Sequence, residues 1–486
     1  MVLNRRFLRV AALGAVFALG LAGTALAAAA TFKWKATDPG AWNVESSWEK
    51  VGAADHDTPT AGDTAIFDKN AEITTLGAAV TVDELKFAGD ATLTLKDAAN
   101  ALTVKKLTVD AGKKATVNSE GADGKFVVDD STGTIIEVLG ELTLGGAKKI
   151  AGKTGTPLTL SENGRLFLRT PMTGVNALKI ENGGVLFVYA QEALPDLGVG
   201  ALTIKGGALV VNGADFGGAA TSLTLEEGEL ILETSMKNTL KTVKVENGRL
   251  IVAPGVKIGN DATPDGELTL GAPNKTGHLD LRGDMTLKTL TTAANVDNTI
   301  TVASGKALTV KSAVDLDLHA TVTGDLNLEM ADTKTATLNK NVDGKVGFKA
   351  PSGGGTATLE LAAQAFARKV DFTAADVGDI FKLKLGQNSE IGTLSFKNTT
   401  AGLEVESGGA YVGFLMLAVP DVTFTATPKL TVKSTSTGRL AIGNGTKGVK
   451  WEADVGKELR VMGKDLLEGE VAVTLSANNS VLTLPS

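Results

Sequence analysis

The feature that most constrains how this chain can fold is an internal repeat of 20 to 24 residues. Five segments share one form, in which two apolar-rich runs flank a short polar stretch that contains Gly. These segments begin at Leu158, Leu178, Leu202, Leu223 and Val243. A near-constant period of this size is typical of repeat proteins, in which each unit packs on its neighbours. The chain is therefore expected to form an array of stacked units.

Each half of the repeat is interpreted as an alternation of apolar and polar residues, which is the period of a strand with one buried face. Between the halves lie residues that tolerate positive φ, as a tight turn requires: Asn163-Gly164, Asn182-Gly183 and Asn247-Gly248. One unit cannot bury an apolar face alone, whereas units stacked about 4.8 Å apart share a continuous core. We therefore predict an all-β, right-handed parallel β-helix. A meander of β-hairpins is the alternative.

Weaker copies of the unit extend the array in both directions, from Val80 to Leu475. One stretch breaks the pattern, because Pro351–Gly355 has the composition of a loop and Leu359–Val370 is expected as a short helix or an irregular coil. The expected organisation is a Trp-rich cap with the first coils over 28–87, a parallel β-helix over 88–345, an irregular interruption over 346–390 and C-terminal coils over 391–486.

Residues 1–27 are typical of a signal peptide. Arg5, Arg6 and Arg9 precede an apolar stretch at Val10–Ala22, and a small-residue cleavage site follows at Ala25–Ala27. The apolar stretch is short for a bilayer span, and no later segment offers about 20 uninterrupted apolar residues. The sequence therefore predicts an exported protein of the bacterial cell surface or the extracellular space, with no transmembrane segment in the mature chain.

Composition narrows the classes of function. Hydrophobic residues make up 43% of the 486, which is enough to build a core. There is no Cys, and the three His are far apart in sequence, so we expect no disulfide, no metal centre and no cofactor. Removal of the signal segment leaves 45 basic and 55 acidic residues. A net charge of −10 disfavours nucleic acid as a partner.

Three of the four Trp lie near the start of the mature chain, at Trp34, Trp42 and Trp48, and the run Pro59–Phe67 follows them. A solenoid must cover the open edge of its first coil, because an uncovered edge templates aggregation. We interpret the Trp-rich segment as this cap. The alternative is a platform of exposed rings for sugar binding.

This order of motifs resembles the opening of bacterial surface proteins with autotransporter-type β-strand repeats. In that family a Trp-rich segment and a Pro-x-x-Gly-Asp-Thr-Ala-x-Phe signature precede a right-handed parallel β-helix, and Pro59–Phe67 fits the signature. The resemblance implies a secreted, passenger-like rod used for adhesion, coating or display. A complete member ends in a membrane barrel with aromatic girdles, whereas the last Phe here is Phe424, so no C-terminal barrel is expected.

The densest polar row is His278, Asp280, Arg282 and Asp284, which alternation places on one strand face. Such a row could hold the acid and base of a β-helix polysaccharide lyase or hydrolase. The favoured interpretation is a solvated strand face with no catalytic role. A second acidic group, Asp55, Asp57 and Asp63, matches no complete calcium loop and is interpreted as turn residues.

These observations favour an exported, non-catalytic structural or adhesive repeat protein over an enzyme. We expect its partners to be cell-surface or extracellular components, with self-association into a coat. The alternative is a β-helix carbohydrate-active enzyme that uses the row from His278 to Asp284.

Overall fold

The computed structural model describes the chain from residue 29 onward. The described part has gaps, and the segments it omits are 37–38, 53–55, 130–134, 149, 153–157, 162–163, 171, 174–176, 182, 190–200, 213–221, 234–239, 260–264, 350, 352–354, 374–379, 397–401, 408–410, 418–420, 425–429, 434–439, 443–449, 454–457, 463–466, 469–472, 475–480 and 484–486. The predicted signal peptide, residues 1–27, lies outside the described residues. Among the residues described, no helix has the length and hydrophobicity that a membrane span requires.

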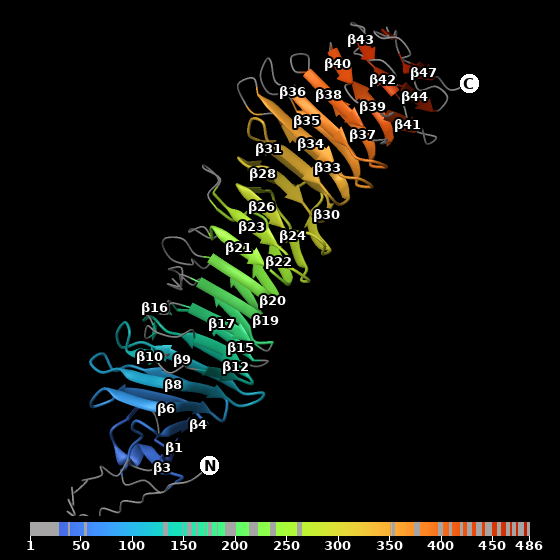
Figure 1. The fold of residues 1–486 in the computed structure, drawn as a ribbon. Helices are drawn as coiled ribbons and strands as arrows, with labels where there is room; N and C mark the ends of the chain where they lie inside the picture. Colours follow the sequence, from blue (N-terminus) through green and yellow to red (C-terminus); the bar gives the residue numbers. More distant parts are fainter. Residues whose placement is uncertain are drawn as a thin grey trace, which may run out of the picture.

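The described strands stack into an elongated parallel β-solenoid, which runs from β1 at its blue end to β47 at its red end (Figure 1). With one exception near the N-terminus, the strands pair in parallel with their counterparts one coil further along the chain. Leu158, Leu178 and Leu202, for example, lie directly opposite one another in three successive coils. The predicted parallel solenoid is confirmed, and the hairpin meander is wrong because neighbouring strands run in the same direction.

Two stacks of strands extend from the N-terminal end. The first stack contains β1 (Thr31–Trp34), β4 (Thr64–Phe67), β6 (Val80–Phe87), β8 (Leu102–Val109), β11 (Ile135–Val138), β14 (Leu158–Ser161), β17 (Ala177–Glu181), β19 (Ala201–Asn212), β20 (Ser222–Leu232), β21 (Thr242–Val245), β23 (Glu267–Leu270) and β26 (Thr289–Thr292). The second stack shares the later halves of β19 and β20 and contains β2 (Gly40–Ala41), β5 (Ala71–Thr75), β7 (Ala91–Leu95), β9 (Lys114–Ser119), β12 (Glu141–Gly145), β15 (Arg165–Leu168), β18 (Val185–Tyr189), β22 (Gly248–Val252), β24 (Gly277–Leu281), β27 (Asn298–Val302) and β30 (Ala320–Thr323).

The remaining strands complete the coils. A third stack continues the early halves of β6 and β8 through β10 (Phe126–Val128), β13 (Ile150–Gly152) and β16 (Met172–Thr173). A fourth stack contains β25 (Met285–Leu287), β28 (Ala307–Ser312), β31 (Asp325–Met330), β33 (Val342–Lys349), β35 (Phe366–Thr373), β37 (Glu390–Phe396), β39 (Tyr411–Leu417), β41 (Leu430–Lys433), β42 (Leu440–Ile442), β44 (Glu458–Met462), β45 (Leu467–Glu468) and β47 (Val481–Thr483). A separate sheet contains β29 (Leu316–Leu318), β32 (Thr335–Leu338), β34 (Thr356–Leu361), β36 (Ile380–Leu385), β38 (Gly402–Ser407), β40 (Asp421–Phe424), β43 (Lys450–Ala453) and β46 (Val473–Thr474).

The core consists of inward-facing apolar side chains that repeat once per coil. One such column is fully buried over five coils and contains Leu160, Ile180, Ile204, Leu225 and Val245. Burial of each branched aliphatic side chain contributes about 1.5–3 kcal/mol relative to exposure. Stacking therefore supplies the apolar burial that a single repeat lacks.

The Gly at the centre of the repeat has a packing role as well as a conformational one. Gly207, Gly228 and Gly248 lie in successive coils, and φ is +113° at Gly228 and +130° at Gly248. A Cβ at Gly228 would lie 2.0 Å from the carbonyl oxygen of Gly207, and one at Gly248 would lie 2.2 Å from that of Gly228. Only Gly permits both the positive φ and this close approach of neighbouring backbones.

The Trp-rich segment forms a buried aromatic cluster at the N-terminal end. Trp34, Trp42 and Trp48 are each at most 2% exposed, and their rings pack on one another and on Phe67 with centroids 4.7–6.4 Å apart. The 3₁₀ helix η1 (Glu45–Ser47) leads into β3 (Trp48–Lys50), which pairs antiparallel with β1. The predicted Trp cluster is confirmed. The alternative of an exposed sugar-binding platform is wrong, because these rings face the core.

The described residues of 346–390 form strands of the solenoid, contrary to the predicted irregular interruption. Leu359–Val370, expected as a short helix or an irregular coil, contributes to β34 and β35. Both strands pair in parallel with the next coil, where Leu359 lies opposite Leu383 and Val370 opposite Leu394. Cross-strand packing outweighs the helix propensity of this Ala-containing segment.

The second half of the repeat also differs from the predicted alternation. Its middle residue is apolar but faces outward in five successive coils of the second stack. We call this column the outer apolar ladder; it consists of Phe167, Phe187, Val210, Ile231 and Ile251. The residues on either side of each member, such as Leu186 and Val188, point inward and are buried. The predicted alternation therefore missed a column of apolar residues on the outward face of this sheet, of which Val210 and Ile251 are themselves buried.

Asp97 closes the turn after β7 with a buried carboxylate. Its oxygens accept hydrogen bonds from the backbone N–H groups of Leu76 at 2.6 Å, Ala99 at 2.7 Å and Asn100 at 2.8 Å. Burial raises the pKa of this carboxyl, but these hydrogen bonds outweigh burial and lower the pKa from 3.8 to about 2. The ionised carboxylate therefore joins two coils.

We expect Asp97→Asn to destabilise the early coils by about 2–3 kcal/mol at neutral pH, because the lowered pKa stabilises the folded state by a free energy of this order. A lowered folded-state pKa stabilises the protein above pH 3.8, and this contribution disappears as the pH falls towards 2. The measurement is urea unfolding of both proteins at pH 7 and pH 2.5, with hydrogen exchange at the Leu76 and Asn100 amides. A stability difference that stays constant between the two pH values would contradict the assignment.

Candidate functional site

The predicted polar row divides between a strand and the turn that follows it. His278 and Asp280 lie on β24 and face outward, whereas Leu279 and Leu281 between and after them are at most 1% exposed. Arg282 and Asp284 follow the end of β24 and are exposed. The structure thus places two of the four residues on one strand face.

The polar groups of this row contact side chains of the neighbouring coils, and Arg282 also contacts Asp280 within the same coil. Arg249 Nη2 lies 2.8 Å from Asp280 Oδ2, and Arg282 Nη2 lies 3.7 Å from the same oxygen. His278 Nδ1 is 2.7 Å from the hydroxyl of Thr299 in the next coil. Asp280 therefore joins two Arg side chains on the surface, and His278 extends the same type of cross-coil contact.

Asp284 belongs to a recurrent structural class. Its Oδ1 accepts a hydrogen bond from the backbone N–H of Ala307 at 3.0 Å, 23 residues further along the chain. Other Asp and Asn side chains accept a backbone N–H 20 to 25 residues ahead in the same way: Asn70, Asp90, Asp315, Asp325, Asp332 and Asn341. The coil period sets this offset, so these side chains hold one coil to the next.

Electrostatics also fit a structural role for Asp284. The N–H of Ala307 and the ammonium group of Lys306 hold the pKa of this carboxyl below its usual range. A general acid of a glycosidase needs a raised pKa, so that it stays protonated near neutral pH. Asp284 is therefore ionised and unsuited to donate a proton.

The acidic residues near the cap are also in structural contacts. Asp63 is 1% exposed and accepts hydrogen bonds from the backbone N–H groups of Ala30 and Thr60, at 2.9 and 2.8 Å. Burial raises its pKa, but these hydrogen bonds and the contact with His56 outweigh burial and lower it. Asp57 pairs with Lys50, and Asp55 lies outside the described residues. In the part of the chain that the structure describes, no cluster of three or more His, Asp or Glu could hold a metal ion.

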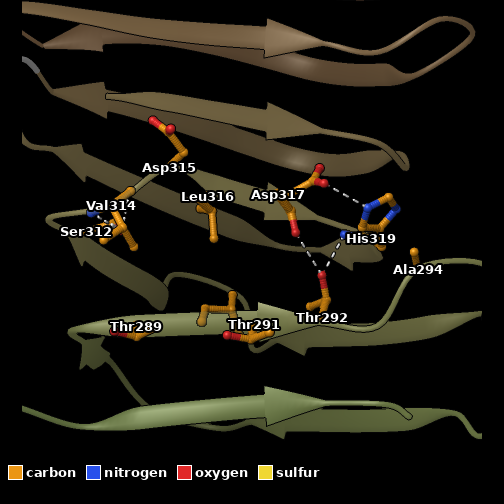
Figure 2. Close-up of a pocket in the computed structure, with 11 residues that line it drawn as sticks. Thr289, Thr291, Thr292, Ala294, Ser312, Val314, Asp315, Leu316, Asp317 and His319 are labelled. Atoms are coloured by element: carbon orange, nitrogen blue, oxygen red, sulfur yellow. Dashed lines mark hydrogen bonds and ion pairs between the residues drawn. The ribbon is translucent and has the colours of Figure 1, made fainter. Parts of the chain in front are cut away.

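The structure also reveals a hollow of about 290 Å³ that was not predicted. It lies where the first stack ends, because β26 and the following β29 contact each other without forming a ladder of backbone hydrogen bonds. Figure 2 shows its lining residues, including Thr291, Asp315, Asp317 and His319.

The side chain of Thr292 bridges the break between the two strands. Its hydroxyl donates to the backbone oxygen of Asp317 at 3.2 Å and accepts from the backbone N–H of His319 at 2.6 Å (Figure 2). The Asp317 carboxylate lies 3.2 Å from His319 Nε2, and Asp315 accepts the N–H of Thr335. The hollow is at the small end of the range for ligand pockets, and its acidic groups are engaged within the solenoid.

Several residues that line this hollow belong to the run Asp315-Leu-Asp-Leu-His319, which is recognisable in the sequence as a second alternating polar row. It has the same alternation as the row from His278 to Asp284, so alternation alone could not distinguish the two. What creates the hollow is the change of sheet between β26 and β29, which depends on how whole coils stack.

The chain matches no protein-family model, no curated protein and no solved structure. The resemblance to autotransporter-type repeat proteins accordingly stays a prediction, carried by residues 31–87.

Proposed function

We propose that this chain is an exported, non-catalytic structural or adhesive repeat protein of the bacterial cell surface, of the passenger-like kind with autotransporter-type repeats. The signal-like segment 1–27 supports export, and the acidic balance of the mature chain disfavours nucleic acid as a partner. The extended outer faces of a stacked rod suit many weak contacts along their length (Figure 1).

The observation that carries this proposal is the way the polar side chains are used. Asp284 and six other Asp and Asn side chains accept backbone N–H groups of the next coil, and Asp280 pairs with two Arg side chains. Groups that could serve as acid or base in an enzyme here hold successive coils together. This use fits a scaffold.

The location is tested with the native protein. We expect N-terminal sequencing to find a start near residue 28, and a protease added to intact cells to digest the protein while it spares a cytosolic marker. A chain that retains Met1 and resists the protease until the cells are lysed would contradict the proposal.

The absence of catalysis is tested separately. We expect purified protein to release no product from anionic or neutral polysaccharides, and Asp280→Ala to behave identically. Loss of the Asp280–Arg249 pair should cost less than about 1 kcal/mol of stability, because both groups lie on the surface. Polysaccharide turnover that disappears in Asp280→Ala would establish the enzyme instead.

A further inference from the structure

The first stack of strands is interrupted at one coil, between β26 and β29. β26 pairs along its length with β23 of the preceding coil, and β29 pairs in the same way with β32 of the next coil. Residues 265–349 are described without a gap, and no ladder of backbone hydrogen bonds forms between β26 and β29. The hollow of about 290 Å³ lies at this contact of Thr289–Thr292 with Leu316–Leu318, which we call the seam.

The hydroxyl of Thr292 crosses the seam where the two strands end. It donates to the backbone oxygen of Asp317 and accepts from the backbone N–H of His319, as Figure 2 shows. In a regular parallel ladder, the backbone of β26 would bond such groups directly. A side chain thus takes the place of the backbone, and because it is interposed, the two strands are held farther apart than the strands of a ladder.

Thr292 also interrupts the aliphatic core of the first stack. In register it lies opposite Leu270, which follows Val245 in the buried column of the preceding coils. It is 7% exposed, so its hydroxyl stands where the earlier coils have an aliphatic side chain. The seam therefore lacks the backbone ladder and part of the apolar packing that hold the other coils of this stack together.

The other faces of the rod are continuous at this level. In the second stack β27 pairs with both β24 and β30, and in the fourth stack β28 pairs with both β25 and β31. The buried Asn298 ties the neighbouring corner, because its Nδ2 donates to the backbone oxygens of Ala293 at 2.9 Å and His319 at 3.3 Å. At the other end of the seam Val314 is 56% exposed. The seam is thus backed by intact ladders and fastened at its Thr292 end (Figure 2).

We propose that the seam is a hinge of the rod, which opens and closes on the face of the first stack while the coils on either side stay intact. The ladders of the second and fourth stacks form the axis, and the hollow gives the two strands room to move. Local opening follows the contacts with the fewest protected backbone hydrogen bonds, and a hinge needs few residues that change. The rod then bends at one defined coil. This inference does not depend on where the cell places the protein.

Hydrogen exchange of the full chain, followed by NMR, tests the opening. We expect the His319 amide, which is bonded across the seam, to exchange about tenfold faster than the Val322 amide, which is bonded to Asn341 within the continuous second stack. Thr292→Val removes the bridging hydroxyl at nearly constant volume, so exchange at His319 should become about tenfold faster again. Thr292→Ser keeps the hydroxyl and should stay within about threefold of the wild type. Thr301→Val, at an exposed position of β27, is the control and should change neither amide.

Spin labels measure the movement itself. The chain contains no Cys, so introduced pairs can be labelled specifically. Thr291→Cys with Thr337→Cys places labels on β26 and β32, on either side of β29 and the seam. Thr301→Cys with Asp343→Cys places them in the same way on either side of β30, where the ladder is continuous. We expect the distance distribution across the seam to be about twice as broad as the control, and Thr292→Val to broaden it further.

A rigid seam would give a different set of results. Exchange at His319 as slow as at Val322, or equal widths for the two label pairs, would overturn the hinge. Unchanged or slower exchange at His319 in Thr292→Val would do so too, because the seam would not then depend on the bridge. Circular dichroism of each variant checks that the rod remains folded. A surface-located chain with a rigid seam would leave the proposed function standing, whereas a hinged chain retained in the cytosol would leave the hinge and contradict that function.

Discussion

Leu225→Asp is expected to unfold the coils around β20, at a cost of about 5 kcal/mol. Leu225 is fully buried in the first stack, between Ile204 of the preceding coil and Val245 of the next. An aspartate there would be ionised without a partner or would have to take up a proton, and both outcomes are costly. The measurement is hydrogen exchange along the chain, which should show lost protection in β19, β20 and β21.

The matched control is Thr224→Asp. Thr224 precedes Leu225 on the same strand but faces outward and is half-buried, so its replacement should change stability by about 0.5 kcal/mol or less. Equal effects of the two substitutions would mean that the inward and outward faces of β20 are assigned incorrectly.

Gly228→Ala is expected to destabilise the same coils by about 3 kcal/mol. One part of this cost is the strain of a side chain at φ = +113°. The other is the contact between the new Cβ and the carbonyl oxygen of Gly207, only 2.0 Å away, which would force two coils apart. Urea unfolding of the purified variant measures the combined effect.

Gly112→Ala separates the two causes. Gly112 also has a positive φ, of +70°, but a Cβ there would meet nothing within 4 Å. Its replacement should therefore cost only the backbone strain, about 1 kcal/mol. If both variants lose the same stability, the close approach of the backbones contributes nothing and the stacking role of Gly228 is wrong.

The sequence by itself determined the solenoid and the positions of many of its strands. The unit recurs from Leu158 to Val252, and its strands cannot bury their apolar faces within one unit. Stacking of the units buries all of these faces at once. Clustered Trp residues likewise predicted the aromatic cluster that Trp34, Trp42 and Trp48 form. These features are local in sequence, or repeat with a regular period, and so can be recognised without coordinates.

The tertiary structure decided which side chains meet across coils. The strands β34 and β35 belong to the solenoid because strands one coil away pair with them, and local propensity carries no information about such distant partners. The cross-coil bond from Asp284 to Ala307 and the hollow beside His319 both depend on register between coils. Register is set by the length of every intervening turn, and a shift of one residue would exchange the inner and outer faces of a strand.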